Sequence, residues 1–337
     1  MSAGPVTRYE ADGGARIYRI PARAFPMLVA NIYVVIAGDY AALIDTGSGL
    51  DESDDDFRTG METLRDEWGE RLTWADLTRI VVTHGHIDHH GGLGAVLGRT
   101  SAPIAVHELD RRVLTNYEER LVLASRALSA FLWRAGVSES NHASLMGMYS
   151  WSKGLFRSVE VATILHDGDL LDGLFLVHHT PGHCPGQVCL QLGDVLFSAD
   201  HVLPRTSPHL APESITPWTG LDHYLLALEK IAAVPEIRLA LGGHEEPIDD
   251  LYARVAQIKS SHMRKLDRVR AACVEPRTIN ELAKTIYPIV QGYDILLAIE
   301  EIGAHVEYLD QRGELEIDNL DEVAEDERAA PRYRQIR

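Results

Sequence analysis

The amino-acid sequence predicts an α/β layered fold. Apolar runs rich in β-branched residues recur along the chain and end in polar or turn residues, as strands do. Amphipathic stretches lie between these runs, and strands that alternate with helices are typical of α/β layers. The length of 337 residues suits one large domain plus a small one, or two medium ones. With 45% hydrophobic and 24% charged residues, the chain can bury a sizeable core.

The predicted strands fall into two groups on either side of a helical region. The first group contains residues 16–20, 31–38, 41–47, 77–85 and 103–110, and the second contains residues 174–180, 188–194, 195–200 and 238–244. Turn residues separate neighbouring strands. Within the first group, residues 51–68 begin with acidic residues and continue as an amphipathic pattern, which predicts a capped helix.

Residues 108–160 interrupt the strands with a mostly helical pattern. The apolar residues near helical spacing are Leu121, Ala124, Leu128, Phe131, Leu132 and Ala135. One interpretation is a core helix, and the other is a lid over a pocket. We favour the lid, because the segment breaks the rhythm of the strands. Methionines and aromatic residues near its end could mould to an apolar ligand, although core packing explains them equally well.

The C-terminal region, residues 251–337, predicts a second, smaller domain. Its helix patterns cover residues 249–273, 278–288 and 295–309, and a turn and strand follow at 311–317. Thr278 is a predicted N-cap, with Glu281 three residues later in a capping box. Three helices followed by a turn and a strand suggest a winged-helix-like module. The tail beyond Glu316 is expected to be disordered.

The charge balance argues against a nucleic-acid partner. Lys and Arg total 32 against 50 Asp and Glu, which gives a formal net charge of −18. Such a surface repels phosphate backbones unless basic residues gather in a patch. The candidate patch consists of Lys259, Arg264, Lys265, Arg268 and Arg270. On a helix these residues spread around much of the circumference, so a solvated face is the simpler interpretation.

Signals for targeting and for disulfides are weak. No run of about 18 or more apolar residues is present, so we expect no membrane span. The N-terminus lacks a basic start followed by an apolar stretch, so we expect a cytoplasmic protein. The cysteines Cys184, Cys189 and Cys273 form no C-x-x-C pair, which argues against a disulfide framework. We expect Cys184 to be a packed small residue.

Residues 81–92 read VVTHGHIDHHGG and are dense in histidine. His84 and His86 lie two apart at the end of a predicted strand, and Asp88 and His89 follow in the turn. Imidazole and carboxylate are ligands suited to zinc, iron or manganese. This spacing lets two histidines reach one ion while the Asp–His pair reaches a neighbouring ion. The two glycines that follow permit a tight turn into a helix.

Three further candidate ligands lie at other strand-to-loop junctions. His183 follows a strand within a Pro/Gly turn, Asp200 ends the next strand, and His244 ends another strand. Loops at the ends of strands are where α/β proteins assemble their sites. A solvated histidine-rich loop would predict none of these distant partners. The candidate metal ligands are therefore His84, His86, Asp88, His89, His183, Asp200 and His244.

These motifs resemble the metallo-β-lactamase superfamily. The matching elements are LIDTG, THGHIDHHGG, TPGHCPGQ, FSAD and GGH, which together span most of residues 16–250. The resemblance implies an αββα metallo-β-lactamase sandwich with a metal site along one edge. Residues 1–250 would then form the catalytic domain, with residues 108–160 as its helical insert.

The same resemblance implies a role for each candidate ligand. His84, His86 and His183 would hold a first ion. Asp88, His89 and His244 would hold a second, and Asp200 would bridge the two. Asp45, within LIDTG, would hydrogen-bond to ligands and orient them, since a histidine ligand needs its other ring nitrogen anchored.

The second half of the chain looks like the lactamase-β-like hydrolases that carry a C-terminal winged helix, and glyoxalase II is a more distant relative. Two positions depart from the pattern. His90 follows the motif where relatives often carry another residue, so we interpret it as a spare histidine. Ala199 replaces a glycine that is common before the bridging aspartate, a change that should keep the ligand. His201 and His209 follow Asp200 closely and could line a substrate pocket.

The ligand set favours a hydrolase. Two ions about 3.5–4 Å apart can activate a shared water at neutral pH, and no G-x-S-x-G elbow is present to supply a serine nucleophile. We expect a dinuclear enzyme with two divalent ions, zinc first and iron or manganese as alternatives. It would use metal-bound hydroxide, while Asp88 or Asp200 takes the proton. An ester, thioester or lactone small-molecule substrate fits the apolar insert and the acidic charge.

Other functions stay open at this level. A metal-dependent endoribonuclease or phosphodiesterase would need the basic patch described above. A mononuclear iron persulfide dioxygenase-like enzyme would use two histidines and an aspartate, and the complete second ligand set argues against it. A DNA-binding regulator would use the winged helix, whereas the net charge favours protein contacts such as those of a homodimer.

Overall fold

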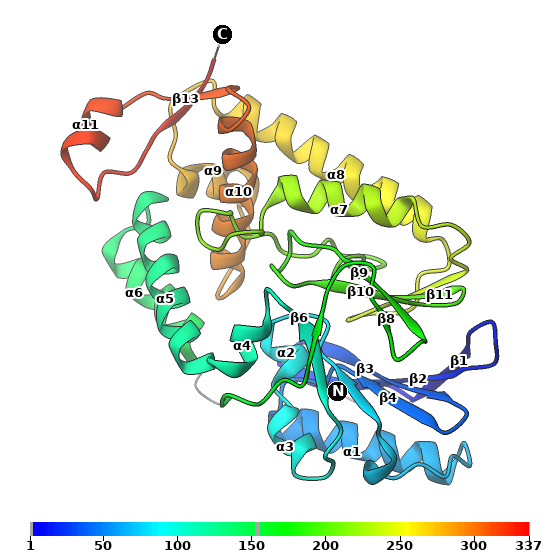
Figure 1. The fold of residues 1–337 in the computed structure, drawn as a ribbon. Coiled ribbons are helices and arrows are strands. Elements are labelled where there is room, and N and C mark those ends of the chain that lie inside the picture. Colours follow the sequence, from blue (N-terminus) through cyan, green and yellow to red (C-terminus); the bar gives the residue numbers. More distant parts are fainter. Residues whose placement is uncertain (1–2, 152–155, 337) are drawn as a thin grey trace.

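The computed structural model describes residues 3–151 and 156–336, and two β-sheets stack face to face at its centre (Figure 1). The larger sheet has seven strands in chain order: β1 (Thr7–Glu10), β2 (Arg16–Phe25), β3 (Leu28–Ala37), β4 (Tyr40–Ile44), β5 (Arg79–Val81), β6 (Ile104–His107) and β7 (Thr163–Leu165). The pairs from β1 to β4 are antiparallel, and those from β4 to β7 are parallel. The early strand predictions are therefore confirmed within a mixed sheet.

The second sheet has five strands. Their order is β12 (Leu239–Gly242), β11 (Val195–Ala199), β10 (Val188–Leu192), β9 (Phe175–His179) and β8 (Leu170–Leu171). All neighbours are antiparallel except β11 and β12, which run parallel. Because parallel strands end at the same edge, the residues that follow β11 and β12 meet there.

Alternating side chains along the strands build two cores. In β3, Ile32 and Val34 face helix α1 (Asp51–Asp66), which contributes Phe57, Met61 and Leu64. Tyr33 faces the second sheet instead, where its ring meets Phe197 edge-on at 5.3 Å between centroids. Successive side chains of a strand point to opposite faces of the sheet, and here both faces are buried.

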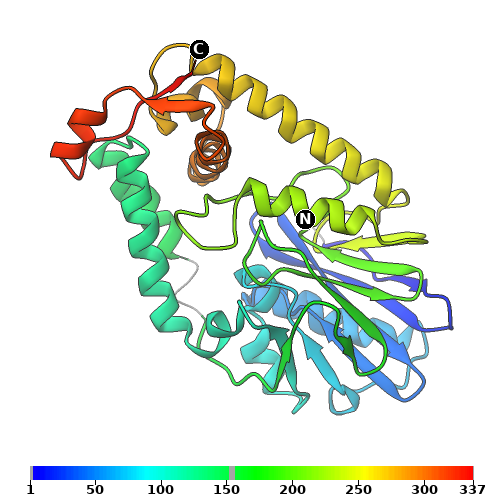
Figure 2. The ribbon, with the colours of Figure 1, turned by 45° about the horizontal axis from the view of Figure 1, so that its top comes forward.

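Helices cover both outer faces, so the layers run helix, sheet, sheet, helix (Figures 1 and 2). The large sheet is covered by α1, α2 (Ile87–His90) and α3 (Leu93–Leu97). The second sheet is covered by α7 (Leu221–Ala232) and α8 (Leu251–Ala272), and Leu196 of β11 shares a core with Leu228 and Val255 of these helices. The predicted αββα sandwich is confirmed.

The predicted insert is helical in the described residues. It forms α4 (Arg111–Thr115), α5 (Tyr117–Arg134) and α6 (Glu139–Trp151). Leu128 and Phe131 of α5 share one core with Ile299 and Ile302 of α10 (Asp294–Asp310). The insert therefore packs on the C-terminal helices, and its role as a lid stays a prediction.

The C-terminal region contains α8, α9 (Ile279–Ile286), α10, β13 (Leu315–Ile317), α11 (Leu320–Glu325) and β14 (Tyr333–Gln335). The predicted capping box at Thr278 and Glu281 is confirmed at the start of α9. The predicted disordered tail differs from the structure, because β14 pairs antiparallel with β13 and Arg334 binds Glu316 at 2.7 Å. The winged-helix assignment and the division at residue 250 stay predictions. Among the described residues, no helix has the length and apolarity that a membrane span requires.

Candidate metal centre

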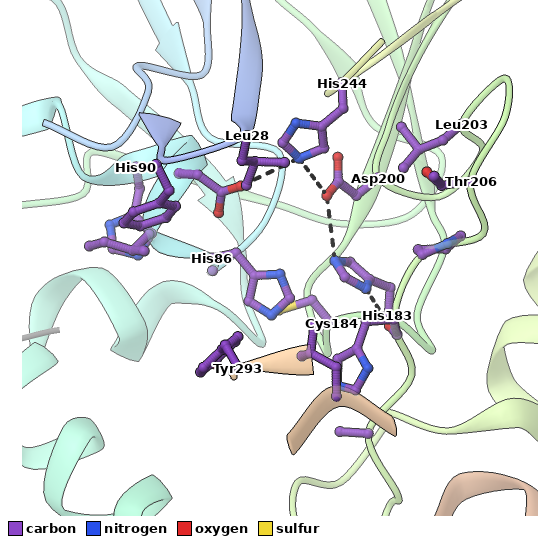
Figure 3. A pocket seen from close by; sticks show the side chains of 18 of the residues that line it. Leu28, His86, His90, His183, Cys184, Asp200, Leu203, Thr206, His244 and Tyr293 are labelled. Carbon is purple, nitrogen blue, oxygen red and sulfur yellow. Dashed lines mark hydrogen bonds and ion pairs between the residues drawn. The ribbon is translucent and has the colours of Figure 1, made fainter. Parts of the chain in front are cut away.

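Seven side chains from both sheets converge at one edge of the sandwich. Of these, Figure 3 labels His86, His183, Asp200 and His244. His84 and His86 follow β5, while Asp88 and His89 lie in α2. His183 follows β9, Asp200 follows β11, and His244 follows β12. All seven candidate ligands predicted from the sequence are brought together here.

The seven side chains form overlapping groups of three. In one group, the nitrogens of His84, His86 and His183 lie within 4.8 Å of one another, with His84 Nε2 3.2 Å from His86 Nδ1. In another group, Asp88, His89 and His244 meet the same limit. A third group, His84, His89 and Asp200, joins the first two.

Asp200 lies between the two groups. Its Oδ2 atom is 3.7 Å from His183 Nε2 on one side and 3.2 Å from His244 Nε2 on the other. Its Oδ1 atom is 3.5 Å from His89 Nε2. A carboxylate in this position can serve both groups.

Several of these inward-facing atoms lack a hydrogen-bond partner within the described chain. They are His89 Nε2, His183 Nε2 and Asp200 Oδ1, and all three are buried. A buried polar atom without a partner costs about 1–3 kcal/mol. Divalent metal ions would remove this cost, since neutral imidazole and carboxylate are their usual protein ligands. The donor set therefore fits a metal centre.

Asp45 anchors the outer nitrogens of two histidines. Its Oδ2 atom accepts from His89 Nδ1 at 2.8 Å and from the Thr83 hydroxyl at 2.8 Å. The Thr83 oxygen in turn lies 3.1 Å from His84 Nδ1. These contacts leave Nε2 of both rings facing inward, as ligand orientation requires. The structure thus puts Asp45 where the resemblance implied.

Backbone carbonyls anchor two further rings. His183 Nδ1 donates to the carbonyl of His209 at 2.6 Å, and His244 Nδ1 donates to the carbonyl of Val29 at 2.7 Å. These bonds fix the tautomers so that Nε2 carries the free lone pair. Sequence reasoning missed both carbonyls, because backbone acceptors carry no residue signature.

Burial and charge set the protonation of the cluster. Burial lowers the pKa of His84 and of His183, which keeps both rings in the neutral, ligand-competent form. Burial alone would lower the pKa of His89, but Asp200 and Asp45 raise it to about 10. Carboxylates thus dominate the field at the centre, and this field attracts a cation.

Asp110 is a site residue that sequence reasoning missed. It is fully buried, and it accepts from the backbone N–H of Gly85 at 2.7 Å and of Gly186 at 2.9 Å. Gly85 separates His84 from His86, and Gly186 follows His183 by three residues. One carboxylate therefore joins both ligand loops. Burial raises the pKa of Asp110 to about 6.

Gly91 and Gly92 are needed for close approach between backbones. Both have negative φ values, −60° and −72°, so neither needs the freedom of a left-handed turn. A Cβ at Gly91 would lie 2.1 Å from the Ser48 carbonyl oxygen, and one at Gly92 would lie 2.1 Å from that of Thr46. The glycines let α2 lie against the loop after β4, which differs from the predicted reason.

The remaining predicted site residues have different surroundings. His209 lines the cavity described below and binds Glu300 at 2.9 Å. His201, predicted as a pocket residue, is instead fully buried against the ring of Tyr224 and is not among the lining residues. It turns into the core behind Asp200, and burial lowers its pKa to about 3.

Two other predictions concern neighbours of ligands. His90 belongs to neither ligand group; its ring meets Phe156 edge-on at 4.5 Å between centroids, in agreement with a spare histidine. Cys184 is buried and its thiol contacts Asp110 at 3.4 Å. Burial and Asp110 together raise the pKa of this thiol, so it is a poor nucleophile.

A cavity of about 1350 Å³ opens onto the cluster. His86, Asp88, His183, Asp200 and His244 line one part of it. Another part of the lining, the apolar wall, is largely apolar and comes from α5, α6 and the start of α10. Its residues include Leu121, Ala124, Leu128, Met148, Tyr149, Tyr293 and Leu297. This volume accommodates a small-molecule ligand with an apolar portion.

The cationic run of α8 forms no open basic patch. Lys259 binds Glu229 at 2.9 Å, and Arg270 binds Glu314 at 2.5 Å. Lys265 is largely buried and binds Glu301 at 2.5 Å. That ammonium group also neutralises the one other cluster of metal-ligand type in the described chain. This cluster consists of His262, Glu301 and His305.

Comparison with known proteins extends this description. Residues 26–272 match the family model of the metallo-beta-lactamase superfamily. The acyl-coenzyme A thioesterase MBLAC2 of Bos taurus is 29% identical over 223 residues, which cover 64% of this chain and 72% of that protein. The probable metallo-hydrolase YqjP of Bacillus subtilis (strain 168) is 22% identical over 298 residues, with coverages of 85% and 89%. A metallo-beta-lactamase family protein from Thermus thermophilus superposes with a TM-score of 0.75 at 25% identity, over 95% of this chain and 98% of that one.

Proposed function

Because this chain belongs to the metallo-β-lactamase superfamily, we propose that it is a dinuclear metal-dependent hydrolase acting on a small acyl substrate. A thioester is the first candidate for the scissile group, and an ester or a lactone follows. The observation that carries the proposal is the convergence of seven ligand-type side chains beside a cavity with an apolar wall. Similarity to a thioesterase supports the choice of bond.

We assign the ligands to two divalent ions. His84, His86 and His183 would hold one ion. Asp88, His89 and His244 would hold the other, and Asp200 would contact both. Bound there, the ions supply Lewis acidity that activates water and polarises the scissile carbonyl. Zinc suits this donor set best, and iron and manganese are alternatives.

The chain itself would manage the proton and the substrate. Asp88 lines the cavity 3.3 Å from His244 Nε2; burial opposes its ionisation, but His89 and His244 lower its pKa, so it is anionic at neutral pH. We assign it to carry the proton from water to the leaving group. The apolar wall of α5 and α6 would hold the acyl chain and exclude water.

A substrate series tests the reaction class. The purified chain, loaded with zinc, manganese or iron in turn, is assayed on an acyl-CoA thioester, a p-nitrophenyl ester and a lactone of equal acyl length. Bis(p-nitrophenyl) phosphate, RNA and a glutathione persulfide complete the series. We expect the fastest turnover on one of the three acyl substrates. Preference for a phosphodiester, for RNA or for the persulfide would overturn the proposal.

Metal analysis tests the dinuclear centre. Seven ligands exceed the four that one tetrahedral ion takes. We therefore expect about two metal ions per chain in protein purified without chelator and equilibrated with excess zinc. His84→Ala and His244→Ala should each remove one of the two. A content that stays at one ion per chain under excess metal would contradict this prediction.

A further inference from the structure

Helix α10 holds the long loop between β11 and α7 through acidic side chains. Glu301 Oε2 accepts from the backbone N–H of Leu210 at 3.0 Å, and Glu300 Oε2 lies 2.9 Å from His209 Nε2. Six residues after Glu301, Glu307 Oε1 accepts from the backbone N–H of Ser214 at 3.1 Å. Three carboxylates of one helix thus bind three consecutive parts of one loop.

The part of the loop that Glu300 and Glu301 hold leads directly to a candidate ligand. The carbonyl of His209 accepts from His183 Nδ1 at 2.6 Å. His209 and Leu210 flank the same peptide bond, and Leu210 is fully buried. The direction of the His209 carbonyl is therefore set on one side by Glu300 and on the other by Glu301.

The carboxylates are themselves held firmly. Glu300 and Glu301 are each only 8% exposed. Lys265 of α8 binds the second oxygen of Glu301 at 2.5 Å. His305 Nδ1 donates to the backbone carbonyl of Glu301 at 2.7 Å, and its Nε2 lies 3.1 Å from His262 Nδ1 of α8. Two C-terminal helices therefore form a stiff base for the contact.

We infer that Glu300 and Glu301 are positioning residues for His183, and that the C-terminal helix α10 thereby forms part of the support of the metal centre. The inference rests on the proposed function, because it requires His183 to bind an ion. Partners outside the ligands hold the ligand rings in the binding orientation, and their loss typically weakens metal affinity 10–100-fold. In this chain the support has one step more: the His209 carbonyl holds the His183 ring, and the carboxylates of Glu300 and Glu301 hold that carbonyl.

Stepwise zinc binding to the full chain tests the inference. Competition with a chromophoric chelator resolves the two binding constants of wild type, Glu300→Ala, Glu301→Ala and Glu300→Gln. We expect each alanine variant to weaken one constant by about 10–100-fold and to leave the other unchanged. Glu300→Gln should lose less, because its amide oxygen can still accept from His209. The visible spectrum of the cobalt-substituted protein should change in the same variants.

Glu307→Ala is the matched control. It removes a carboxylate of the same helix that binds the same loop, but Ser214 lies five residues beyond His209, whose carbonyl holds His183. Because Glu307 does not hold the His209 carbonyl, its loss should not cause the 10–100-fold weakening that follows the loss of an orienting partner. We therefore expect both zinc-binding constants of this variant to stay within about threefold of wild type. A general loosening of the loop would instead weaken zinc binding in all of these variants, and that result would overturn the inference.

His183→Ala separates failure of the inference from failure of the proposed function. This variant should lose the same binding step that the alanine variants weaken. If His183→Ala leaves both constants unchanged, the ligand assignment is wrong and the inference falls with it. If His183→Ala loses the step while folded Glu300→Ala and Glu301→Ala bind like wild type, only the inference is overturned. Should both alanine variants fail to fold, Glu300→Met replaces them, because it fills the same space but cannot accept from His209. Unchanged constants in a folded Glu300→Met would overturn the inference.

Discussion

Asp88 and Cys184 both line the cavity but differ in their chemical surroundings. Asp88 faces two imidazoles of the candidate centre, whereas the Cys184 thiol is directed to buried Asp110. Asp88→Asn keeps the size of the side chain but removes its charge and its capacity to accept a proton. We expect turnover on the best acyl substrate to fall at least about 10²-fold.

Cys184→Ser is the control for that measurement. The hydroxyl can replace the thiol in its contact with Asp110, and no chemical role is assigned to the sulfur. Steady-state turnover should therefore stay near that of wild type, with metal content intact. Near-normal turnover in Asp88→Asn, or collapse in Cys184→Ser, would show that the chemistry belongs to other residues.

Residues with a chemical signature could be identified from the sequence, and residues that act by position could not. The candidate metal ligands are histidines and aspartates at strand ends, so residue type and spacing identified them. Asp110 is one acidic residue among 50, and only the fold reveals that it joins Gly85 to Gly186. His201 follows Asp200 in sequence, but only the fold reveals that its ring is buried against Tyr224 and away from the cavity.

At the scale of elements, α2 can contact the loop after β4 only because glycines, which lack a side chain, lie between them. Gly91→Ala would bring a Cβ to 2.1 Å from a backbone oxygen, which cannot move as a side chain could. We expect the free energy of unfolding to fall by about 1–3 kcal/mol, as overpacking generally costs. Metal affinity should fall too, since α2 carries Asp88 and His89.

Gly94→Ala on neighbouring α3 gives the comparison for this prediction. A Cβ there meets nothing within 4 Å, and alanine favours an exposed helix over glycine by about 1 kcal/mol. Urea unfolding should show this variant to be as stable as wild type or slightly more stable. Equal stability of the two variants would contradict the close-approach explanation.

From the apolar wall formed by α5 we predict which length of acyl chain the substrate carries. Ala124 lines the cavity, so Ala124→Phe should fill part of the acyl site. We expect the variant to prefer a shorter acyl chain than wild type, read as kcat/KM across a series of acyl thioesters. Ala130→Phe lies on an exposed part of the same helix outside the lining and should leave the preference unchanged. An unaltered profile in Ala124→Phe would exclude α5 as the acyl-binding wall.

At the scale of the whole molecule, the Lys265–Glu301 pair joins α8 to α10 and to the loop beyond β11. Burial alone would raise the pKa of Glu301, but Lys265 and nearby histidines lower it to about 2. A folded-state pKa below the unfolded value means that the ionised carboxylate stabilises the fold above about pH 4.5. This contribution is lost as the pH falls toward 2.

Glu301→Gln should therefore lower the free energy of unfolding at pH 7, and its deficit should shrink as the pH falls below 4.5. Urea unfolding at several pH values measures the difference. Glu316→Gln removes an exposed partner of Arg334 and should change stability by less than about 1 kcal/mol throughout. A deficit for Glu301→Gln that does not depend on pH would contradict the assignment of charge.

The layers of helices and sheets could be predicted from the sequence, whereas the contacts between elements far apart in the chain could not. Period-two patterns and family motifs indicated the two sheets. The common core of α5 with α10 joins segments more than 160 residues apart, such as Leu128 and Ile299, and helical spacing alone names no partner. The tail strand β14 was missed because it has only three residues, which are mostly exposed and form no apolar run.

The candidate ligands are divided between the two sheets. His84, His86, Asp88 and His89 lie in the loop after β5 of the large sheet and in helix α2, which follows it. His183, Asp200 and His244 lie in loops of the second sheet. An ion bound by both sets would act as a cross-link between the halves of the sandwich. Ligand binding to the native state alone adds RT ln(1 + [L]/Kd) to its stability. When metal is scarce, the chain would then lose both its activity and part of its stability, and it would be exposed to proteolysis. Only the metal-bound molecules would persist.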